Sequence, residues 1–201
     1  MRQKKLTFVT LDLLKSKGVI IEPQQLNLPK NKKIHLEIGS GKGQFITSLA
    51  HDNKDDFFIA FEINMSVIYR IVEKKEALNL DNLFIIFDDG KHLEQYLTFE
   101  SIDYIYLNFS DPWPKKKHHK RRLTAPSFLA LYAHALKKDG ILQFRTDVLP
   151  FFEDSLETIA KVFNIFDVTY QLEPSLYMTE YEEKKRLIST INQVKGQKKH
   201  A

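Results

Sequence analysis

The sequence contains no cysteine, which excludes disulfide bonds, thiolate metal sites and cysteine nucleophiles. It also lacks any apolar run long enough to span a membrane. Met1 is followed by charged residues with no apolar segment behind them, so we expect no secretory signal and a cytoplasmic protein. The one close histidine pair, His118 and His119, has no acidic ligand beside it, so we expect no metal site.

Positive charge is concentrated in one short segment of the 201 residues. The run from Lys115 to Arg122 carries six positive charges and no acid. Removing those six charges from the net charge of +4 leaves −2 for the rest of the chain. Smaller basic clusters lie near both ends, at Arg2, Lys4 and Lys5 and at Lys195, Lys198 and Lys199. A focused patch on a nearly neutral chain indicates a polyanionic partner.

Apolar runs typical of strands alternate with segments of helical spacing, which predicts an α/β fold with a mostly parallel sheet. We expect strands at residues 34–38, 57–61, 83–87, 102–108, 140–146 and 165–170. We expect helices at residues 44–51, 66–78, 92–97, 126–136 and 150–162. Residues 180–194 fit neither pattern clearly. Without a repeat or a long linker, residues 1–201 are expected to form a single domain with short basic tails.

Polar residues follow every predicted core strand. In an open α/β sheet, ligands bind at the carboxyl ends of the strands, where the strand order reverses. The residues at those ends are Glu37, Glu62, Asp88 with Asp89, the segment from Asn108 to Trp113, and Asp147. We therefore expect a site at this edge of the sheet.

The segment Glu37-Ile-Gly-Ser-Gly-Lys-Gly43 joins the first predicted strand to the first helix. Gly39 and Gly41 permit a tight turn that a ligand can approach closely, although such a turn can also be purely structural. Its glycine spacing differs from that of dehydrogenases, and the ending of a phosphate-binding P-loop is missing. We interpret the turn as part of a ligand site.

Acidic residues after the second and third strands suit a nucleoside. Glu62 is placed to accept hydrogen bonds from both hydroxyls of a ribose, or alternatively to cap the following helix. Asp88 is favoured over Asp89 as a contact for an adenine amino group, and either acid is also suited to a plain helix N-cap.

The most specific segment is Asn108-Phe-Ser-Asp-Pro-Trp-Pro114, in which two prolines flank the only tryptophan. We expect Phe109 and Trp113 to stack on a base while the basic run behind them binds phosphates. The alternative for the run is a solvated charged loop. The acids among residues 179–183 are equally suited to a solvated helix start.

Together these motifs resemble the bacterial tRNA (guanine-N7)-methyltransferase family. The resemblance runs from Ile34 to Lys184 and rests on the glycine turn, the Asp-Pro-Trp loop with its basic stretch, Lys120-Arg-Arg-Leu, Thr146-Asp147 and Thr179-Glu-Tyr-Glu-Glu-Lys184. It implies a Rossmann-like class I methyltransferase fold, with a mostly parallel seven-stranded sheet and helices on both faces. It also implies S-adenosylmethionine as cosubstrate and guanosine 46 in the tRNA variable loop as target.

The resemblance also implies roles for individual residues. The positions that match the family's cofactor-binding residues are Glu37, Glu62, Asp88 and Asp111, beside Gly39 and Gly41. The positions that match its guanine-binding residues are Lys115, Asp147, Thr179, Glu180, Tyr181 and Glu182. The segment that matches its RNA-binding stretch comprises Lys117, His118, His119, Lys120, Arg121 and Arg122. We assign catalysis to Asp111, between cofactor and substrate, and to Asp147, which would hold the guanine ring.

Two features depart from the family pattern. Only residues 171–178 separate the late strand from the Thr179 motif, and the tail after Lys184 lacks the usual short apolar strand. We therefore expect a shortened C-terminal region.

Three other functions stay open. They are a class I methyltransferase acting on another RNA atom or on a small molecule, an inactive RNA-binding module of the same fold, and, least favoured, a nicotinamide dehydrogenase. The oligomeric state, monomer or homodimer, is also open.

Overall fold

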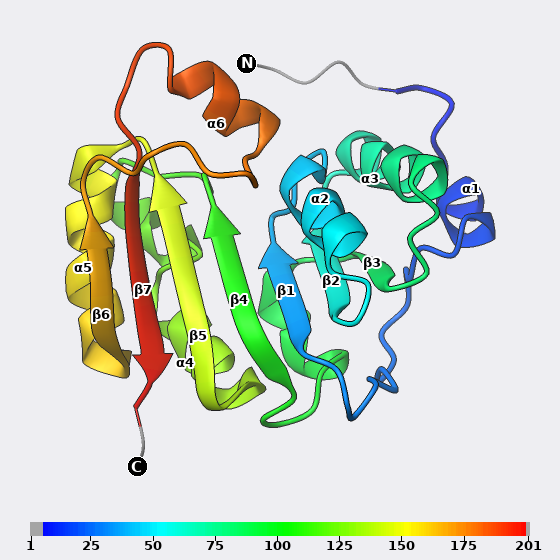
Figure 1. Ribbon diagram of the computed structural model, residues 1–201, viewed down its shortest axis with the longest axis horizontal. Helices are drawn as coiled ribbons and strands as arrows, with labels where there is room; N and C mark the ends of the chain where they lie inside the picture. The colour runs from blue at the N-terminus through cyan, green and yellow to red at the C-terminus, as the bar shows by residue number, and fades with distance from the viewer. Residues whose placement is uncertain (1–5, 200–201) are drawn as a thin grey trace.

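Seven strands form one sheet in the computed structural model, which describes residues 6–199 (Figure 1). The strands are β1 (Ile34–Ile38), β2 (Phe57–Glu62), β3 (Leu83–Phe87), β4 (Ile102–Asn108), β5 (Leu136–Thr146), β6 (Phe163–Thr169) and β7 (Asn192–Lys198). Their order is β3-β2-β1-β4-β5-β7-β6. All paired neighbours are parallel except that β7 runs antiparallel to both β5 and β6.

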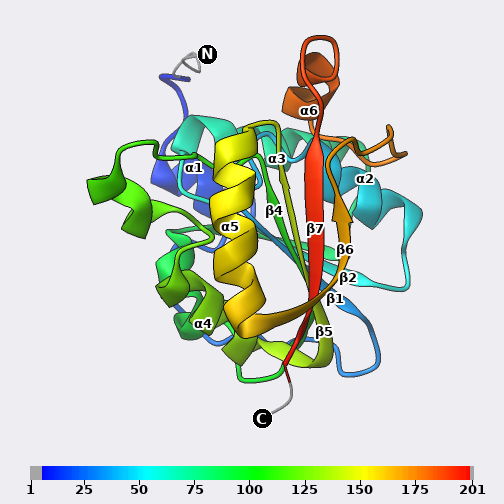
Figure 2. The ribbon, with the colours of Figure 1, turned by 90° about the vertical axis from the view of Figure 1, so that its left-hand side faces the viewer.

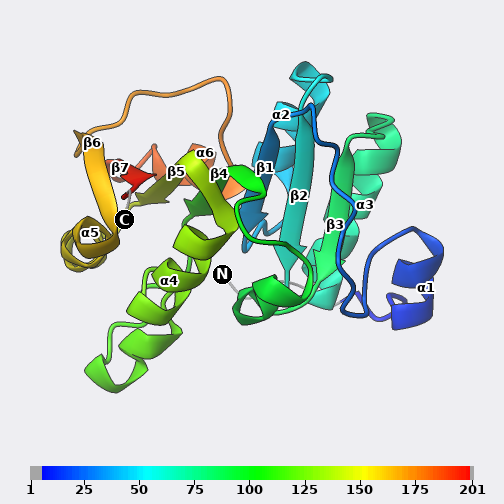
Figure 3. The same ribbon diagram turned by 90° about the horizontal axis from the view of Figure 1, so that it is seen from below.

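Helices cover both faces of this sheet. They are α1 (Leu11–Ser16), α2 (Gln44–Asp52), α3 (Met65–Ala77), α4 (Pro126–Ala135), α5 (Leu149–Val162) and α6 (Glu180–Lys185), with short 3-10 helices η1 (Gly90–Gln95) and η2 (Lys116–Arg121). Figure 2 shows α2 and α5 on opposite sides of the strands. The helices α4 and α5 lie side by side (Figure 3).

Alternation along the central strands builds two cores. In β2, Phe57, Ile59 and Phe61 join a cluster with α4 and α5, whereas Phe58 and Ala60 join a cluster with α1, α2 and α3. A strand covered on both faces reads as a continuous apolar run, which is why β1 and β2 are recognisable in the sequence. The strand order reverses between β1 and β4, so the carboxyl ends of these neighbours open a crevice.

The C-terminal region differs from the expectation. The segment that fitted no clear pattern forms α6 and the start of β7, and the tail supplies a full strand between β5 and β6. Polar partners replace the apolar alternation of an ordinary strand. The side chain of Gln193 accepts from Arg145 Nε at 2.8 Å and donates to Asp167 at 3.3 Å, and Lys195 pairs with Asp167 at 2.9 Å. The tail after Lys184 thus supplies the last of the seven expected strands, although it lacks the apolar pattern by which a strand is recognised.

Smaller differences concern element ends. The helix predicted at residues 92–97 is the 3-10 helix η1, which begins at Gly90 after an Asp89 cap. The strand β5 begins at Leu136 rather than at Gly140, directly after α4. The residues Arg2, Lys4 and Lys5 lie outside the described residues, and the single-domain organisation of residues 1–201 stays a prediction.

Candidate active site

A cavity of about 850 Å³ lies at the carboxyl ends of β1 to β4. It brings together five residues predicted to bind a cofactor or to act in catalysis, namely Gly39, Gly41, Glu62, Asp88 and Asp111. The aromatic side chains Phe109 and Trp113 and the basic residues Lys120 and Arg121 also line it. The predicted site edge therefore contains a real hollow, bordered on one side by the basic run.

The glycine turn forms one wall of this cavity. Gly39, Gly41 and Gly43 all adopt left-handed backbone conformations, with φ of +73°, +55° and +78°. An added Cβ at Gly43 would lie 2.9 Å from Ile71 Cγ1, so glycine is needed there for close packing of α2 on α3. At Gly41 an added Cβ would meet nothing within 4 Å, so the turn leaves open space on the cavity side.

Glu62 holds this turn in place. Its Oε2 accepts from the Gly41 N–H at 2.8 Å, and its Oε1 accepts from the Asn64 N–H at 2.8 Å. Asn64, not Glu62, is the N-cap of α3. Burial raises the pKa of Glu62, and the backbone donors oppose that rise. Because each carboxylate oxygen can accept more than one hydrogen bond, Glu62 retains capacity for the two hydroxyls of a ribose.

Glu37 lies behind the turn, fully buried. Its Oε1 accepts from Asn108 Nδ2 at 2.8 Å, while its Oε2 has no hydrogen-bond partner among residues 6–199. Burial raises the pKa of Glu37 to about 8, and the Asn108 amide opposes this rise. The neighbouring Asn108 Oδ1 and Ser110 Oγ are also buried without a partner in the described chain. Unpartnered oxygens on a buried carboxyl group and on the amide hydrogen-bonded to it suit a cationic group such as an ammonium.

Two adjacent acids at the end of β3 have different contacts. The Asp88 carboxylate accepts from His92 Nδ1 at 2.9 Å and from Tyr96 Oη at 2.8 Å, so its orientation is fixed. The carboxylate of Asp89 instead accepts from the Lys91 N–H at 3.1 Å and caps η1. These contacts give Asp89 the capping role and leave Asp88 as the better-oriented acid in the cavity wall, as preferred from the sequence.

The Asp-Pro-Trp loop is held in an unusual conformation. Phe109 and Trp113 have positive φ angles, +54° and +39°. Residues other than glycine rarely adopt this conformation, and where they do they are often found at functional sites. The ring of Trp113 is covered by the Arg121 guanidinium at 4.9 Å and by the His118 ring at 5.7 Å. Asp111, between these aromatics, is exposed at the cavity rim.

Asp147 contacts α6 and does not itself line the cavity. Its Oδ2 pairs with Lys185 Nζ at 3.1 Å, and Tyr181 Oη lies 3.4 Å from both of its oxygens. The Tyr181 ring in turn lies 5.2 Å from that of Phe109. Asp147 does not cap α5, whose N-cap is Val148. The structure thus brings the predicted guanine-binding residues Asp147 and Tyr181 together with an aromatic side chain of the loop.

The other residues of the Thr179 motif anchor α6. Glu182 is fully buried, and its oxygens engage Arg145 at 3.4 Å and Arg186 at 2.6 Å. Thr179 caps α6 by accepting from the Glu182 N–H, and Glu180 pairs with Lys74 of α3 at 2.6 Å. These contacts leave the Glu182 carboxylate no free edge for a guanine, so the arrangement supports Tyr181 more than Glu182 as a substrate contact.

The basic run divides into exposed and buried members. Lys115, Lys117, Lys120 and Arg121 are exposed, and His118 and His119 are half-buried. Arg122, in contrast, is buried and pairs with Asp154 of α5 at 3.0 Å. The predicted RNA contact by Arg122 is therefore not supported, because its side chain points into the protein.

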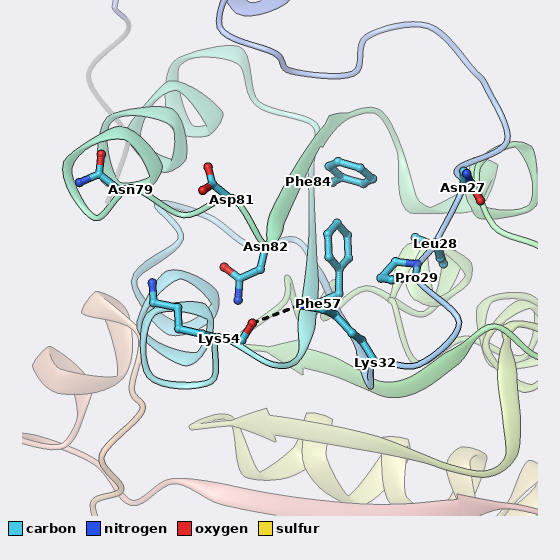
Figure 4. A pocket seen from close by; sticks show the side chains of 10 residues that line it. All are labelled: Asn27, Leu28, Pro29, Lys32, Lys54, Phe57, Asn79, Asp81, Asn82 and Phe84. Atoms are coloured by element: carbon cyan, nitrogen blue, oxygen red, sulfur yellow. Dashed lines mark hydrogen bonds between the residues drawn. The ribbon is translucent and has the colours of Figure 1, made fainter.

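A second cavity, of about 540 Å³, lies at the opposite edge of the sheet (Figure 4). Phe57 and Phe84 form its apolar side, and Asn82, Lys32 and Lys54 contribute polar groups. It contains neither the glycine turn nor any acid from the carboxyl ends of β1 to β5. Of the two cavities, only the first is lined by residues that the sequence predicts to act at the site.

Sequence reasoning missed three contributors to the site. Lys185 pairs with Asp147 across 38 positions, and nothing local in the sequence indicates that pair. The buried strand residue Arg145 binds Glu182 and the Tyr177 carbonyl, which ties β5 to the α6 region. Asn108 orients Glu37, and its place at the end of β4 was a usable signal.

Known proteins match this chain over most of its length. A family model described as "Putative methyltransferase" matches residues 31–192. A tRNA (guanine-N(7)-)-methyltransferase from Lachnoclostridium phytofermentans is 46% identical over 160 residues, covering 77% of this chain and 75% of that protein. One from Staphylococcus haemolyticus is 44% identical with the same coverage. The chain belongs to the tRNA (guanine-N7)-methyltransferase family. The resemblance inferred from the sequence motifs is thereby confirmed.

The fold is that of class I methyltransferases. A crystal structure of a 16S rRNA methyltransferase superposes with a TM-score of 0.67 at 15% identity, covering 99% of this chain and 97% of that one. At this identity the likeness concerns the fold alone. The predicted Rossmann-like seven-stranded architecture is confirmed.

No helix among residues 6–199 is both long and apolar enough to cross a membrane. The same residues contain no cluster of three or more histidine and acidic side chains arranged to hold a metal ion.

Proposed function

We propose that this member of the family transfers a methyl group from S-adenosylmethionine to N7 of a guanine in tRNA. The observation that carries this proposal is the continuity of three surfaces. The cavity with Glu62 and Asp88 is also lined by Asp111 and by the exposed basic residues Lys120 and Arg121. Its lining residue Phe109 contacts the ring of Tyr181, whose hydroxyl lies 3.4 Å from Asp147. A nucleoside cofactor, a base and a phosphate backbone thus have adjacent places.

The residues of the cavity fit the cofactor group by group. Glu62 would accept from the ribose hydroxyls, and Asp88, held by His92 and Tyr96, would face the adenine amino group. The unpartnered Oε2 of Glu37 would accept from the cationic α-amino group. When bound, S-adenosylmethionine supplies an electrophilic methyl group on a positively charged sulfur.

The protein's task in the transfer is positioning. Guanine N7 has an in-plane lone pair and no hydrogen, so no base has to deprotonate it before it attacks the methyl carbon. The new N7–carbon bond forms as the carbon–sulfur bond breaks, and positive charge passes to the guanine ring. Asp147 would hold the ring through its N–H groups and stabilise this charge, with the Tyr181 and Phe109 rings beside it.

Binding of guanine at Asp147 must compete with Lys185. In the structure the Lys185 ammonium pairs with the Asp147 carboxylate. A guanine that displaces Lys185 would donate hydrogen bonds to that carboxylate instead, so the carboxylate would not be left without a partner. The exposed residues Lys117, Lys120 and Arg121 would contact phosphates, which fixes the register of the RNA without reading its bases.

Finer features of the function are proposed from the family resemblance and composition. The target is guanosine 46 of the variable loop. The protein acts in the cytoplasm, which agrees with the lack of cysteine. An inactive RNA-binding role is disfavoured because the cofactor cavity retains Gly39, Gly41, Glu62 and Asp88 together.

The test is methyl transfer to unmodified tRNA with a labelled donor, followed by chemical cleavage specific for N7-methylguanine. We expect a single cleavage in the variable loop and none in a transcript whose guanine 46 is replaced by adenine. Transfer without that cleavage would identify another RNA atom as the target. Cofactor binding without any transfer would favour the inactive module.

A further inference from the structure

Arg122 stands apart within the described run from Lys115 to Arg122. Its side chain is only 9% exposed, whereas its neighbour Arg121 is exposed at the cavity rim. Burial of a guanidinium is unfavourable unless its donors find partners. The partners of Arg122 therefore show what the residue does.

Each part of the guanidinium has a different partner. Its Nε donates to the Pro112 carbonyl at 2.7 Å, one terminal nitrogen pairs with Asp154 Oδ2 at 3.0 Å, and the other lies 2.9 Å from His119 Nε2. Its flat face lies 4.9 Å from the centre of the Phe151 ring. Three of its five N–H donors are engaged in this way, and the burial of the side chain leaves little room for a phosphate at the other two.

These partners belong to two elements that border the reaction site. Pro112 lies between Asp111 and Trp113, in the loop after β4, whereas Asp154 and Phe151 lie on α5, the helix that begins just after Asp147. A second hydrogen bond, between Thr124 Oγ1 and Ser155 Oγ at 2.8 Å, joins the same segment to α5. The guanidinium thus bridges the loop that carries Asp111 and the helix that follows Asp147.

The bond to the Pro112 carbonyl also fixes the peptide that leads into Trp113. Trp113 has a φ of +39°, a conformation that persists in residues other than glycine only when surrounding contacts impose it. A planar group with five donors in a fixed arrangement is suited to that task, and a lysine ammonium is not.

We infer that Arg122 is a positioning residue, which fixes the Asp111–Trp113 loop against α5, and that it is not a phosphate ligand. The inference rests on the proposed function, because the loop contributes Asp111 to the cofactor cavity and Trp113 to the RNA side. Arg121 and Arg122 are adjacent and of the same residue type, and they have different roles.

The decisive variant is Arg122→Lys, which keeps the positive charge and loses the planar fork. We expect cofactor affinity measured by calorimetry to fall about tenfold, the effect of losing a hydrogen bond made by a charged group. Trp113 is the only tryptophan, so its fluorescence reports on this loop. We expect acrylamide, a neutral quencher, to quench it more strongly than in the wild-type protein. A phosphate ligand, in contrast, would tolerate lysine, and both readouts would stay at wild-type values, which overturns the inference.

The salt dependence of tRNA binding provides the second readout. In Arg122→Gln we expect the slope of log affinity against log salt to be unchanged. In the matched control Lys117→Ala it falls by about 0.7 to 0.9, with cofactor affinity and tryptophan quenching unaltered. A slope in Arg122→Gln that falls as it does in Lys117→Ala would also overturn the inference.

A further variant covers the case in which Arg122 variants fail to fold. The double variant His119→Ala/Asp154→Ala leaves Arg122 in place and removes two of its side-chain partners. We expect increased quenching of Trp113, and wild-type quenching would overturn the inference. If the wild-type protein bound no cofactor, the proposed function would fail, and the quenching comparison would still decide the role of Arg122.

Discussion

Because the carboxyl group of Glu37 is buried, we predict that cofactor binding releases a proton from it. Burial raises its pKa from 4.5 to about 8, so near neutral pH the group is protonated in the free protein. An ammonium placed against its unpartnered oxygen favours the ionised form. Below pH 8 the carboxyl must therefore lose its proton when the cofactor binds.

The magnitude follows from linkage. If binding releases one proton, the association constant rises up to about tenfold per pH unit well below 8 and levels off as pH approaches that value. Measurements from about pH 5.5 to about 7 keep the α-amino group of the cofactor mostly charged, since such groups titrate at about 7.7–8.0. The variant Glu37→Gln cannot ionise and should show weak binding that does not change with pH.

Calorimetry tests this directly. At about pH 6.5 the observed binding enthalpy should vary linearly with the ionisation enthalpy of the buffer, with a slope approaching one proton. A wild-type affinity independent of pH, together with a binding enthalpy independent of the buffer, would refute the assignment of Glu37 to the ammonium.

The same raised pKa has a consequence for stability. A carboxyl group that is protonated when folded and ionised when unfolded costs stability as pH rises from 4.5 to about 8. The stability of Glu37→Gln relative to the wild-type protein should therefore increase across that window.

Three further predictions concern charge. Replacing Lys117, Lys120 and Arg121 together by alanine should lower the salt slope of tRNA binding by about 2 to 3, whereas replacing the exposed residues Lys15, Lys33 and Lys54 should leave it nearly unchanged. Glu182→Gln should lower the free energy of unfolding by about 3–5 kcal/mol in denaturant titrations, because it leaves Arg145 without its buried counter-charge, and the exposed Glu183→Gln serves as control. Asp147→Asn should slow single-turnover methyl transfer by roughly two orders of magnitude with cofactor affinity little changed, and a wild-type rate would remove Asp147 from the mechanism.

Elements with a strong periodic signal were predictable from the sequence. The strands β1 to β4 were placed within one residue because each is an apolar run covered on both faces, and their carboxyl ends then located Glu37, Glu62, Asp88 and Asp111. The strand β7 was missed because its stability comes from long-range polar pairs such as Gln193 with Arg145, which leave no alternating apolar pattern.

The roles of charged residues were harder to predict, because identical side chains differ only in what surrounds them. Within the Thr179 motif, Glu180 pairs with a lysine on α3. Glu182 instead pairs with Arg145, which is distant in sequence, and with Arg186, four residues further along the chain. A carboxylate's burial depends on how α6 is placed over β5, and no local feature of residues 179–183 specifies that placement.

Adjacent residues of the basic run show how buried and exposed charges share the work of this site. Arg121 lies over Trp113 at the rim, where a phosphate can reach it, and Arg122 lies beneath, bound to Pro112, His119 and Asp154. An RNA that binds the exposed cations is then held against a loop whose backbone the buried cation fixes. Methyl transfer to N7 requires alignment more than proton transfer. The charges that rigidify the loop should therefore matter to the rate as much as those that touch the RNA.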